Sequence, residues 1–203
     1  MAKRGYRGKH PHNDMKVDNV AASKVNPKLK AQYDKLKNNK TKYDFIRTNY
    51  FYPQATATIT VADGDAASGM TEKESMVITA TDGTIGTYAI LDDEETSVAT
   101  GTVLASNTDT GTSTAGSGLV GAIAVTINLT GTASTQNDFL VQLKAAIEHA
   151  NSPLNGKVVV SAVPSEANGN QSITLTQLEP GPHGNVTITT DISQATPAGF
   201  TGG

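Results

Sequence analysis

The sequence predicts an α+β fold that is mainly β: an antiparallel sheet or sandwich of about seven strands with one helix (135–150), preceded by an extended basic N-terminal arm. Three observations support this prediction. Between residues 55 and 191, short segments alternate apolar side chains with Thr, which is the period of half-buried strands. After residue 40, a single segment has a convincing helical period. Charge and aromatic content also separate the N-terminal quarter of the chain from the rest.

The predicted helix over residues 135–150 has one apolar face and a defined start. That face, with spacings of three and four residues, is formed by Phe139, Leu143, Ala146, Ile147 and Ala150. Thr135 can cap the N-terminus, and Asp138 three residues later gives a near capping box with a carboxylate at the positive end of the helix. Asn151 and Pro153 are expected to end the helix.

Seven segments are predicted as strands: 55–61, 75–82, 84–91, 122–130, 157–163, 171–177 and 185–191. The second and third form the clearest hairpin, turning at Asp82-Gly83, where positive φ is tolerated. In the fourth strand, Val125, Ile127 and Leu129 should share one face. The pattern fits either a helix laid across an antiparallel sheet or a sandwich with the helix capping one open face.

The connections are predicted from composition. Residues 105–118 are rich in Thr, Ser and Gly, so we expect a mobile surface loop there. Residues 195–203 are expected to form a short tail, with Phe200 as a possible pin. The chain of 203 residues has no cysteine and no apolar run near eighteen residues, so we expect neither disulfides nor a membrane span.

Charge divides the chain into two parts. Residues 1–50 contain 13 of the 16 Lys and Arg and 4 of the 19 acidic residues, a net charge of +9, whereas the remainder carries −12. Aromatic residues divide in the same way. Seven of the ten Tyr and Phe residues precede residue 53. We therefore predict a basic, aromatic docking arm over 1–53 and an acidic, Thr-rich β domain over 54–203.

The arm is too polar to fold alone. Residues 1–24 should have no independent structure, whereas 27–38 can form a short helix that needs a surface to dock on. Residues 43–53 are interpreted as an extended aromatic anchor. The arm has three interpretations: a solvated charge run, a nucleic-acid tail, or a protein-docking segment that folds on binding. The aromatic cluster favours the third.

The sequence contains no strong motif for catalysis, for metal binding or for cofactor binding. The G-x-G-x-x-G match at residues 116–121 leads from a loop into a strand, unlike a dinucleotide site. The acidic residues fall in predicted turns, where a weak divalent-cation site at 63–65 or 92–95 is conceivable. His10, His12, His149 and His183 do not converge in sequence, and no G-x-S-x-G motif occurs. We expect no enzymatic activity, no metal centre and no cofactor.

Three segments resemble a module that recurs in virion proteins of tailed bacteriophages. They are SMVITATDGTIGTYAI at 75–90, DFLVQLKAAIEHAN at 138–151, and KVVVSAVPSEANGNQSITLTQLEPGPHGNVTITT at 157–190. The resemblance covers roughly residues 70–203 and implies a structural role. The favoured form is a capsid decoration or cement protein on the capsid surface of the virion, present in multiple copies, whose arm clamps onto capsid subunits while the β domain faces outward.

Under this interpretation, the residues that bind the capsid protein are aromatic and apolar anchors with lysine charge partners. The anchors are Tyr43, Phe45, Ile46, Tyr50, Phe51 and Tyr52, and the lysines are Lys28, Lys30, Lys35 and Lys37. Two alternatives are a tail, neck or fibre component that mediates assembly or host attachment, and a nucleic-acid packaging accessory that acts through the arm. A third is that the aromatic residues cover the protein's own sheet. We expect no membrane partner and, under the first interpretation, no nucleic-acid partner.

Overall fold

The computed structural model describes residues 34–35, 53–63, 69–93, 98–104, 119–130, 134–165 and 169–203. The chain divides into two units, Met1–Tyr52 and Pro53–Gly203. The predicted helix at 27–38 and the aromatic anchor at 43–53 lie outside the described residues, apart from Asp34, Lys35 and Pro53. The architecture below is that of the second unit.

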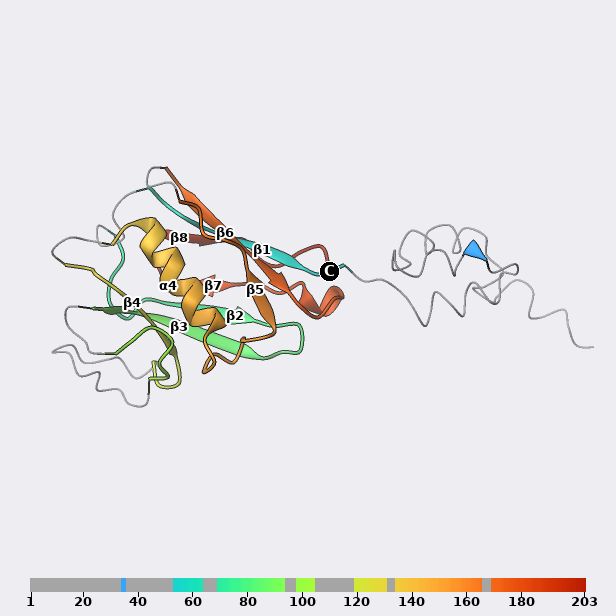
Figure 1. The fold of residues 1–203 in the computed structure, drawn as a ribbon, viewed down its shortest axis with the longest axis horizontal. Coiled ribbons are helices and arrows are strands. Elements are labelled where there is room, and N and C mark those ends of the chain that lie inside the picture. The colour runs from blue at the N-terminus through green and yellow to red at the C-terminus, as the bar shows by residue number, and fades with distance from the viewer. Residues whose placement is uncertain are drawn as a thin grey trace, which may run out of the picture. The chain divides into compact units, whose positions relative to one another are not determined.

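Two four-stranded sheets form the second unit (Figure 1). The first sheet has the order β5-β6-β1-β8 and consists of β1 (Thr56–Val61), β5 (Val158–Val160), β6 (Gln171–Gln177) and β8 (Ala195–Pro197). The second has the order β4-β3-β2-β7 and consists of β2 (Ser75–Thr79), β3 (Ile85–Asp92), β4 (Ile123–Ile127) and β7 (Thr189–Thr190).

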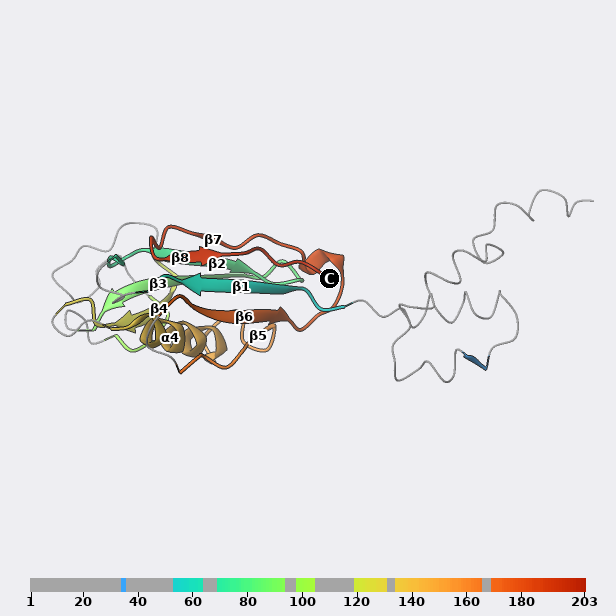
Figure 2. The same cartoon turned by 90° about the horizontal axis from the view of Figure 1, so that it is seen from above.

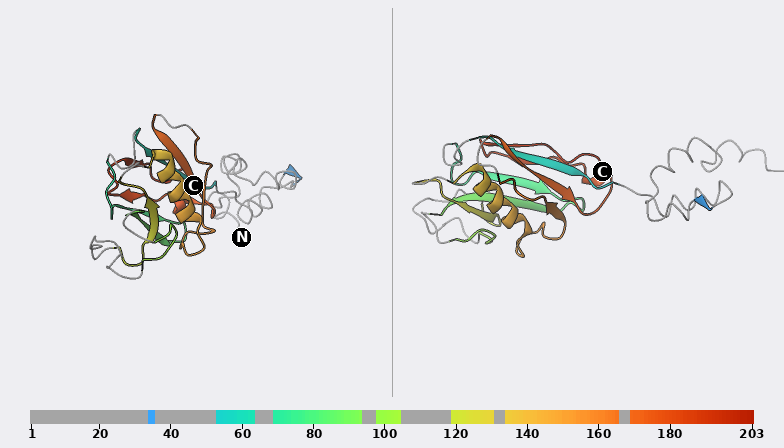
Figure 3. Two further views of the ribbon diagram at one scale, coloured as in Figure 1. Left: turned by 60° about the vertical axis from the view of Figure 1, so that its left-hand side comes forward. Right: turned by 45° about the horizontal axis from the view of Figure 1, so that its top comes forward.

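Helix α4 (Gln136–Glu148) closes one side of the two sheets. It packs against β4 and β3 of one sheet and against β5 and β6 of the other. Figure 2 shows the helix along one side and the short strands β7 and β8 along the opposite side, and Figure 3 shows the helix crossing both sheets. The sandwich layout with a helix over its open side is therefore confirmed, and the single-sheet layout is wrong.

The pairing of β3 with β4 is parallel, which the prediction of an antiparallel arrangement missed. Tyr88 is level with Ile123, and the register continues to the pair Asp92 and Ile127. On the edge of β4 that faces away from β3, the segment 101–104 pairs with the strand, and Gly101 N–H donates to the Ala124 carbonyl at 2.9 Å. A period of two reports which residues face the core but carries no information on strand direction.

The main core lies between the sheets and against α4. Its largest fully buried side chains include Tyr88 and Phe139. The strands contribute chiefly Ile59, Met76, Ile78, Ile90, Ile123, Val125, Ile127, Ile173 and Leu175. A second, smaller cluster covers the outer face of β3 and β4 and comprises Ala89, Leu91, Leu104, Leu119, Ala122 and Ala124. These two strands are therefore buried on both faces.

All seven predicted strands are present, most of them shorter than predicted. Val125 and Ile127 are buried together as predicted, and Leu129 packs against the same core. The predicted strand at 185–191 is reduced to β7, and the predicted C-terminal tail forms an eighth strand, β8. Phe200 is buried, as expected for a side chain that anchors the C-terminal segment to the core. The predicted mobile loop at 105–118 lies outside the described residues.

Helix α4 begins as predicted. Thr135 Oγ1 accepts from Asp138 N at 3.2 Å, and Asp138 Oδ2 accepts from Thr135 N at 2.8 Å, which completes the capping box. The helix ends at Glu148, and Ala150 is exposed rather than on the buried face. Leu140 and Gln136 are also buried, so the apolar face is broader than predicted.

The cap gives the first testable prediction. Thr135→Ala removes the hydroxyl that accepts the Asp138 N–H, so we expect the free energy of unfolding to fall by about 1 kcal/mol. Urea denaturation of the full chain measures the change. Thr135→Ser retains the hydroxyl and should remain close to wild type; an equal loss in both variants would contradict a capping role.

Candidate functional site

A pocket opens at the end of the sandwich where β1 begins. Its volume is about 320 Å³, and its lining comes from three separate segments: Ala80, Thr81, Asp82, Gly156, Lys157, Gln177, Leu178 and Glu179. These segments are the β2–β3 turn, the turn before β5 and the end of β6. Figure 1 marks the C-terminus at the same end. The pocket is the candidate site because it brings charged and amide side chains from both sheets together.

The β2–β3 turn places Asp82 at the pocket. Gly83 adopts φ of 83°, its N–H donates to the Ala80 carbonyl at 2.9 Å, and Ala80 N–H donates to the Thr84 carbonyl at 2.8 Å. Asp82 Oδ1 accepts from Thr84 N at 2.9 Å, which fixes the carboxylate over the turn. The predicted Asp82-Gly83 hairpin turn is therefore confirmed.

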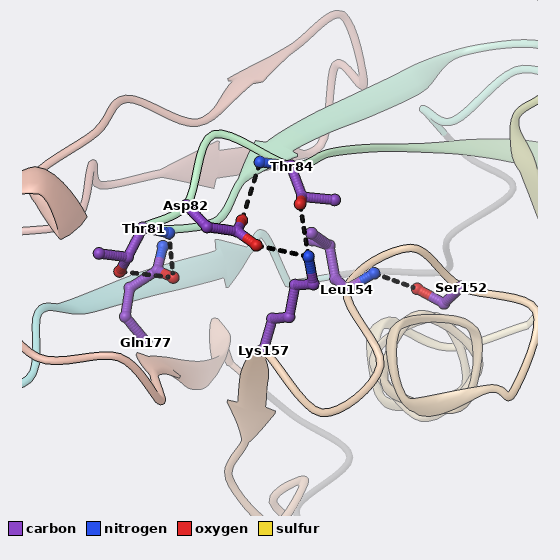
Figure 4. Close-up of polar contacts among 7 residues, drawn as sticks. All are labelled: Thr81, Asp82, Thr84, Ser152, Leu154, Lys157 and Gln177. Atoms are coloured by element: carbon purple, nitrogen blue, oxygen red, sulfur yellow. Dashed lines mark hydrogen bonds and ion pairs between the residues drawn. The ribbon is translucent and has the colours of Figure 1, made fainter.

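Lys157 faces Asp82 from the turn before β5 (Figure 4). This turn is closed by Lys157 N–H donating to the Leu154 carbonyl at 2.9 Å, with Gly156 at φ of 73°. Lys157 Nζ donates to Asp82 Oδ2 and to Thr84 Oγ1, each at 2.5 Å. The bond from Lys157, followed by the bond from Thr84, holds the pKa of Asp82 well below its usual range. Asp82 is therefore ionised at neutral pH and poorly suited to proton transfer there.

This ion pair gives a pH prediction. The folded-state pKa of Asp82 is lowered, so its contribution to stability is present above the unfolded-state pKa of about 4 and is lost as pH falls below it. Lys157→Met should therefore reduce the loss of stability between pH 5 and pH 2, measured as urea midpoints. Lys144→Met removes the Lys144–Glu148 pair on α4 instead. We expect Lys144→Met to leave the contribution of Asp82 in place. If Lys157→Met lost as much stability between pH 5 and pH 2 as wild type does, the stabilising role of the Asp82–Lys157 pair would be contradicted.

Gln177 forms the floor of the site and joins the two sheets. Its side chain is fully buried. Oε1 accepts from Thr81 N at 3.0 Å and from Thr81 Oγ1 at 3.3 Å (Figure 4). Nε2 donates to the Thr79 carbonyl at 2.8 Å. The amide of a β6 residue thus satisfies backbone groups of the β2–β3 hairpin in the other sheet. Such a buried amide is costly to leave unpaired.

Tyr88 and Ser152 are buried in the protein interior. Their hydroxyl oxygens are 2.8 Å apart, and Ser152 Oγ also accepts from Leu154 N at 3.2 Å. Burial raises the pKa of Tyr88 to about 12, with the bond to Ser152 acting in the opposite direction. The pair therefore stays neutral at physiological pH and orders the turn that carries Lys157.

The sequence predicted Asp82 only as a turn residue and gave no functional role to Lys157, Gln177, Tyr88 or Ser152. Gln177 has a detectable signal, since it shares the inward phase of β6 with Ile173 and Leu175. An amide in that phase implies a buried hydrogen-bonding role. The pairing of Asp82 with Lys157 has no comparable signal, because 75 positions separate the two residues.

The sequence-predicted site residues fall mainly outside the described residues. These are Tyr43, Phe45, Ile46, Tyr50, Phe51, Tyr52, Lys28, Lys30 and Lys37, whereas Lys35 is described and exposed. The structure therefore leaves the docking assignment as a prediction.

The two conceivable cation sites are partly described. Asp63 Oδ1 accepts from Gln136 Nε2 at 3.4 Å. Asp92, expected in a solvated turn, instead ends β3 with 3% of its surface exposed and accepts from Leu129 N at 3.3 Å. Residues 64–65 and 94–95 lie outside the described ranges. Within the described ranges, no group of three or more His, Cys, Asp or Glu side chains is placed to hold a metal ion.

The histidines that are described lie apart from the pocket lining. His149 follows α4, packs beside Gly101 and accepts through Nδ1 from Asn151 N at 3.2 Å. His183 is exposed in the short 3₁₀ helix η4 (Pro182–Gly184). Gly121 of the glycine motif precedes strand β4, as expected for a loop that leads into a strand.

Comparison of the chain with models of protein families, with curated proteins and with solved structures found no match. Among the helices that the structure describes, none is both long enough and apolar enough to cross a membrane.

Proposed function

We propose that the protein is a structural component of a bacteriophage virion, a capsid decoration or cement protein whose N-terminal arm docks onto capsid subunits. The observation that carries the proposal is the distribution of aromatic side chains. The three aromatic residues of the second unit, Tyr88, Phe139 and Phe200, are all buried in its core. The other seven aromatic residues lie in the first 52 positions. Because Tyr and Phe are strong interface anchors, this surplus supports a docking role for the arm.

The charge distribution supports the same role. A segment of net charge +9 followed by a remainder of −12 suits an arm that binds an acidic surface of the capsid. Several anchors spread along an arm can add their contributions through multivalency, so that individually weak contacts hold a subunit on a particle.

The test is binding of the full chain to purified, genome-free capsid shells, with tails assayed in parallel. Tyr50→Ala combined with Phe51→Ala should abolish shell binding, because two central anchors are removed. Val141→Ala removes apolar area from an exposed residue of α4 and should bind normally. Full shell occupancy by the double variant would overturn the proposal.

Two further outcomes would redirect it. Capture by tails but not by shells would support a tail, neck or fibre component. Binding to nucleic acid that falls steeply between low and moderate salt would support a packaging accessory, since phosphate contacts release counterions. Aromatic anchoring on shells should weaken only modestly over the same range.

A further inference from the structure

The point where the chain enters the β domain is fixed beside the pocket. The Pro53 carbonyl accepts from Gly181 N at 3.1 Å, and Gln54 Nε2 donates to the Leu178 carbonyl at 2.8 Å. Thr56 N–H donates to the Thr201 carbonyl at 2.9 Å, which continues this attachment into β1. Leu178 also lines the pocket. The first residues of the domain and the pocket are therefore parts of one ordered surface, which we call the entry end.

The pocket has an acidic surplus and an exposed apolar wall. Lys157 is neutralised by Asp82 at 2.5 Å. Glu179 is exposed, and within the described part of the chain no side-chain partner is found for its carboxylate. Beside it, Leu178 leaves 41% of its surface exposed. A free carboxylate next to an apolar side chain suits a long basic side chain, whose stem packs on Leu178 while its charged head reaches Glu179.

We propose that the pocket at the entry end receives an arginine or lysine side chain of the capsid subunit to which the arm docks. This inference rests on the proposed function. A docked arm restrains the entry end near the surface that holds it, so a second contact there forms at a high effective concentration. Arginine fits best, because its planar guanidinium can bind the Glu179 carboxylate in a bidentate manner.

The hydrogen bonds of the pocket allow the negative charge of Glu179 to be removed without disturbing the fold. The backbone carbonyl of Glu179 accepts from Thr81 Oγ1 at 3.1 Å, and this bond does not depend on the Glu179 side chain. Leu178 likewise contributes to the fold through its backbone, since its N–H donates to the Lys157 carbonyl at 2.8 Å. Substitutions of these two side chains should therefore leave the domain folded.

The experiment measures the affinity of full-chain variants for genome-free capsid shells at moderate salt. We expect Glu179→Gln to weaken binding roughly tenfold, equivalent to about 1.4 kcal/mol, and Leu178→Ala to weaken it by a similar or smaller factor. Asp63→Asn removes one exposed negative charge beyond the opposite end of β1 and retains its side-chain oxygen, so it should bind as wild type does. Equal thermal midpoints for the variants establish that the fold is retained.

The outcomes separate this inference from the proposed function. If Glu179→Gln binds as tightly as wild type while the Tyr50→Ala/Phe51→Ala variant does not bind, the pocket inference is wrong and the decoration role stands. If the arm double variant keeps full occupancy, the proposed function fails instead. Equal weakening by Glu179→Gln and Asp63→Asn would show a general charge effect and would also overturn the pocket assignment.

Discussion

Phe139→Ala should lower the free energy of unfolding by about 3–5 kcal/mol, the largest effect expected from a single substitution in this domain. Phe139 is fully buried on α4, and this helix packs against strands of both sheets. Phe139 belongs to the main core cluster, so its truncation leaves a cavity in the core against which the helix packs. Because small domains are stable by only about 5–15 kcal/mol, much of the total would be lost.

Urea or thermal denaturation of the full chain measures this effect, with Val141→Ala as the matched control. Val141 lies on the same helix with 49% of its surface exposed, so its truncation should cost less than about 0.5 kcal/mol. If the two variants lost equal stability, helix propensity rather than core packing would explain the loss. Phe139→Leu should fall between wild type and Phe139→Ala, since it restores most of the buried volume.

The positions of helix and strands follow from the sequence because periodicity reports burial directly. The Thr135 and Asp138 cap and the Asp82-Gly83 turn are local, since each depends on residues at most four positions apart. The boundaries of the strands were predicted less accurately than their positions. The two-residue strand β7 and the strand β8 form only because β2 and β1 offer pairing partners distant in sequence. Pairing of this kind leaves little trace in a composition-based pattern.

Strand direction and the candidate site needed the structure. The parallel β3–β4 pair depends on the course of residues 98–104, whose glycine at 101 adopts φ of 88° beside His149. Asp82 and Lys157 meet because a hairpin of one sheet and a turn of the other reach the same end of the sandwich. Such convergence is a property of the tertiary fold, which single-sequence patterns do not encode.

Gln177→Leu should lower the free energy of unfolding by roughly 3 kcal/mol although it keeps the buried volume nearly constant. The substitution removes the acceptor for Thr81 N and the donor for the Thr79 carbonyl, leaving two backbone groups of the β2–β3 hairpin without their partner. The loss should therefore be one of hydrogen bonding rather than packing. Thr176→Val, one residue earlier and only partly buried, should change stability by less than about 0.5 kcal/mol.

Gln177→Glu separates these contributions through pH. A buried glutamate favours its neutral form, so its folded-state pKa should rise above the unfolded value of about 4.3. Below about pH 4.3 the protonated carboxyl can accept from Thr81 N and donate to the Thr79 carbonyl, as the amide of Gln177 does. Above it the variant must bury a charge or stay protonated at a cost, so its stability relative to wild type should fall as pH rises from 4 to 7. Denaturation midpoints of both proteins at each pH measure the difference, and a pH-independent gap would show that Gln177 does not join the two sheets as the structure indicates.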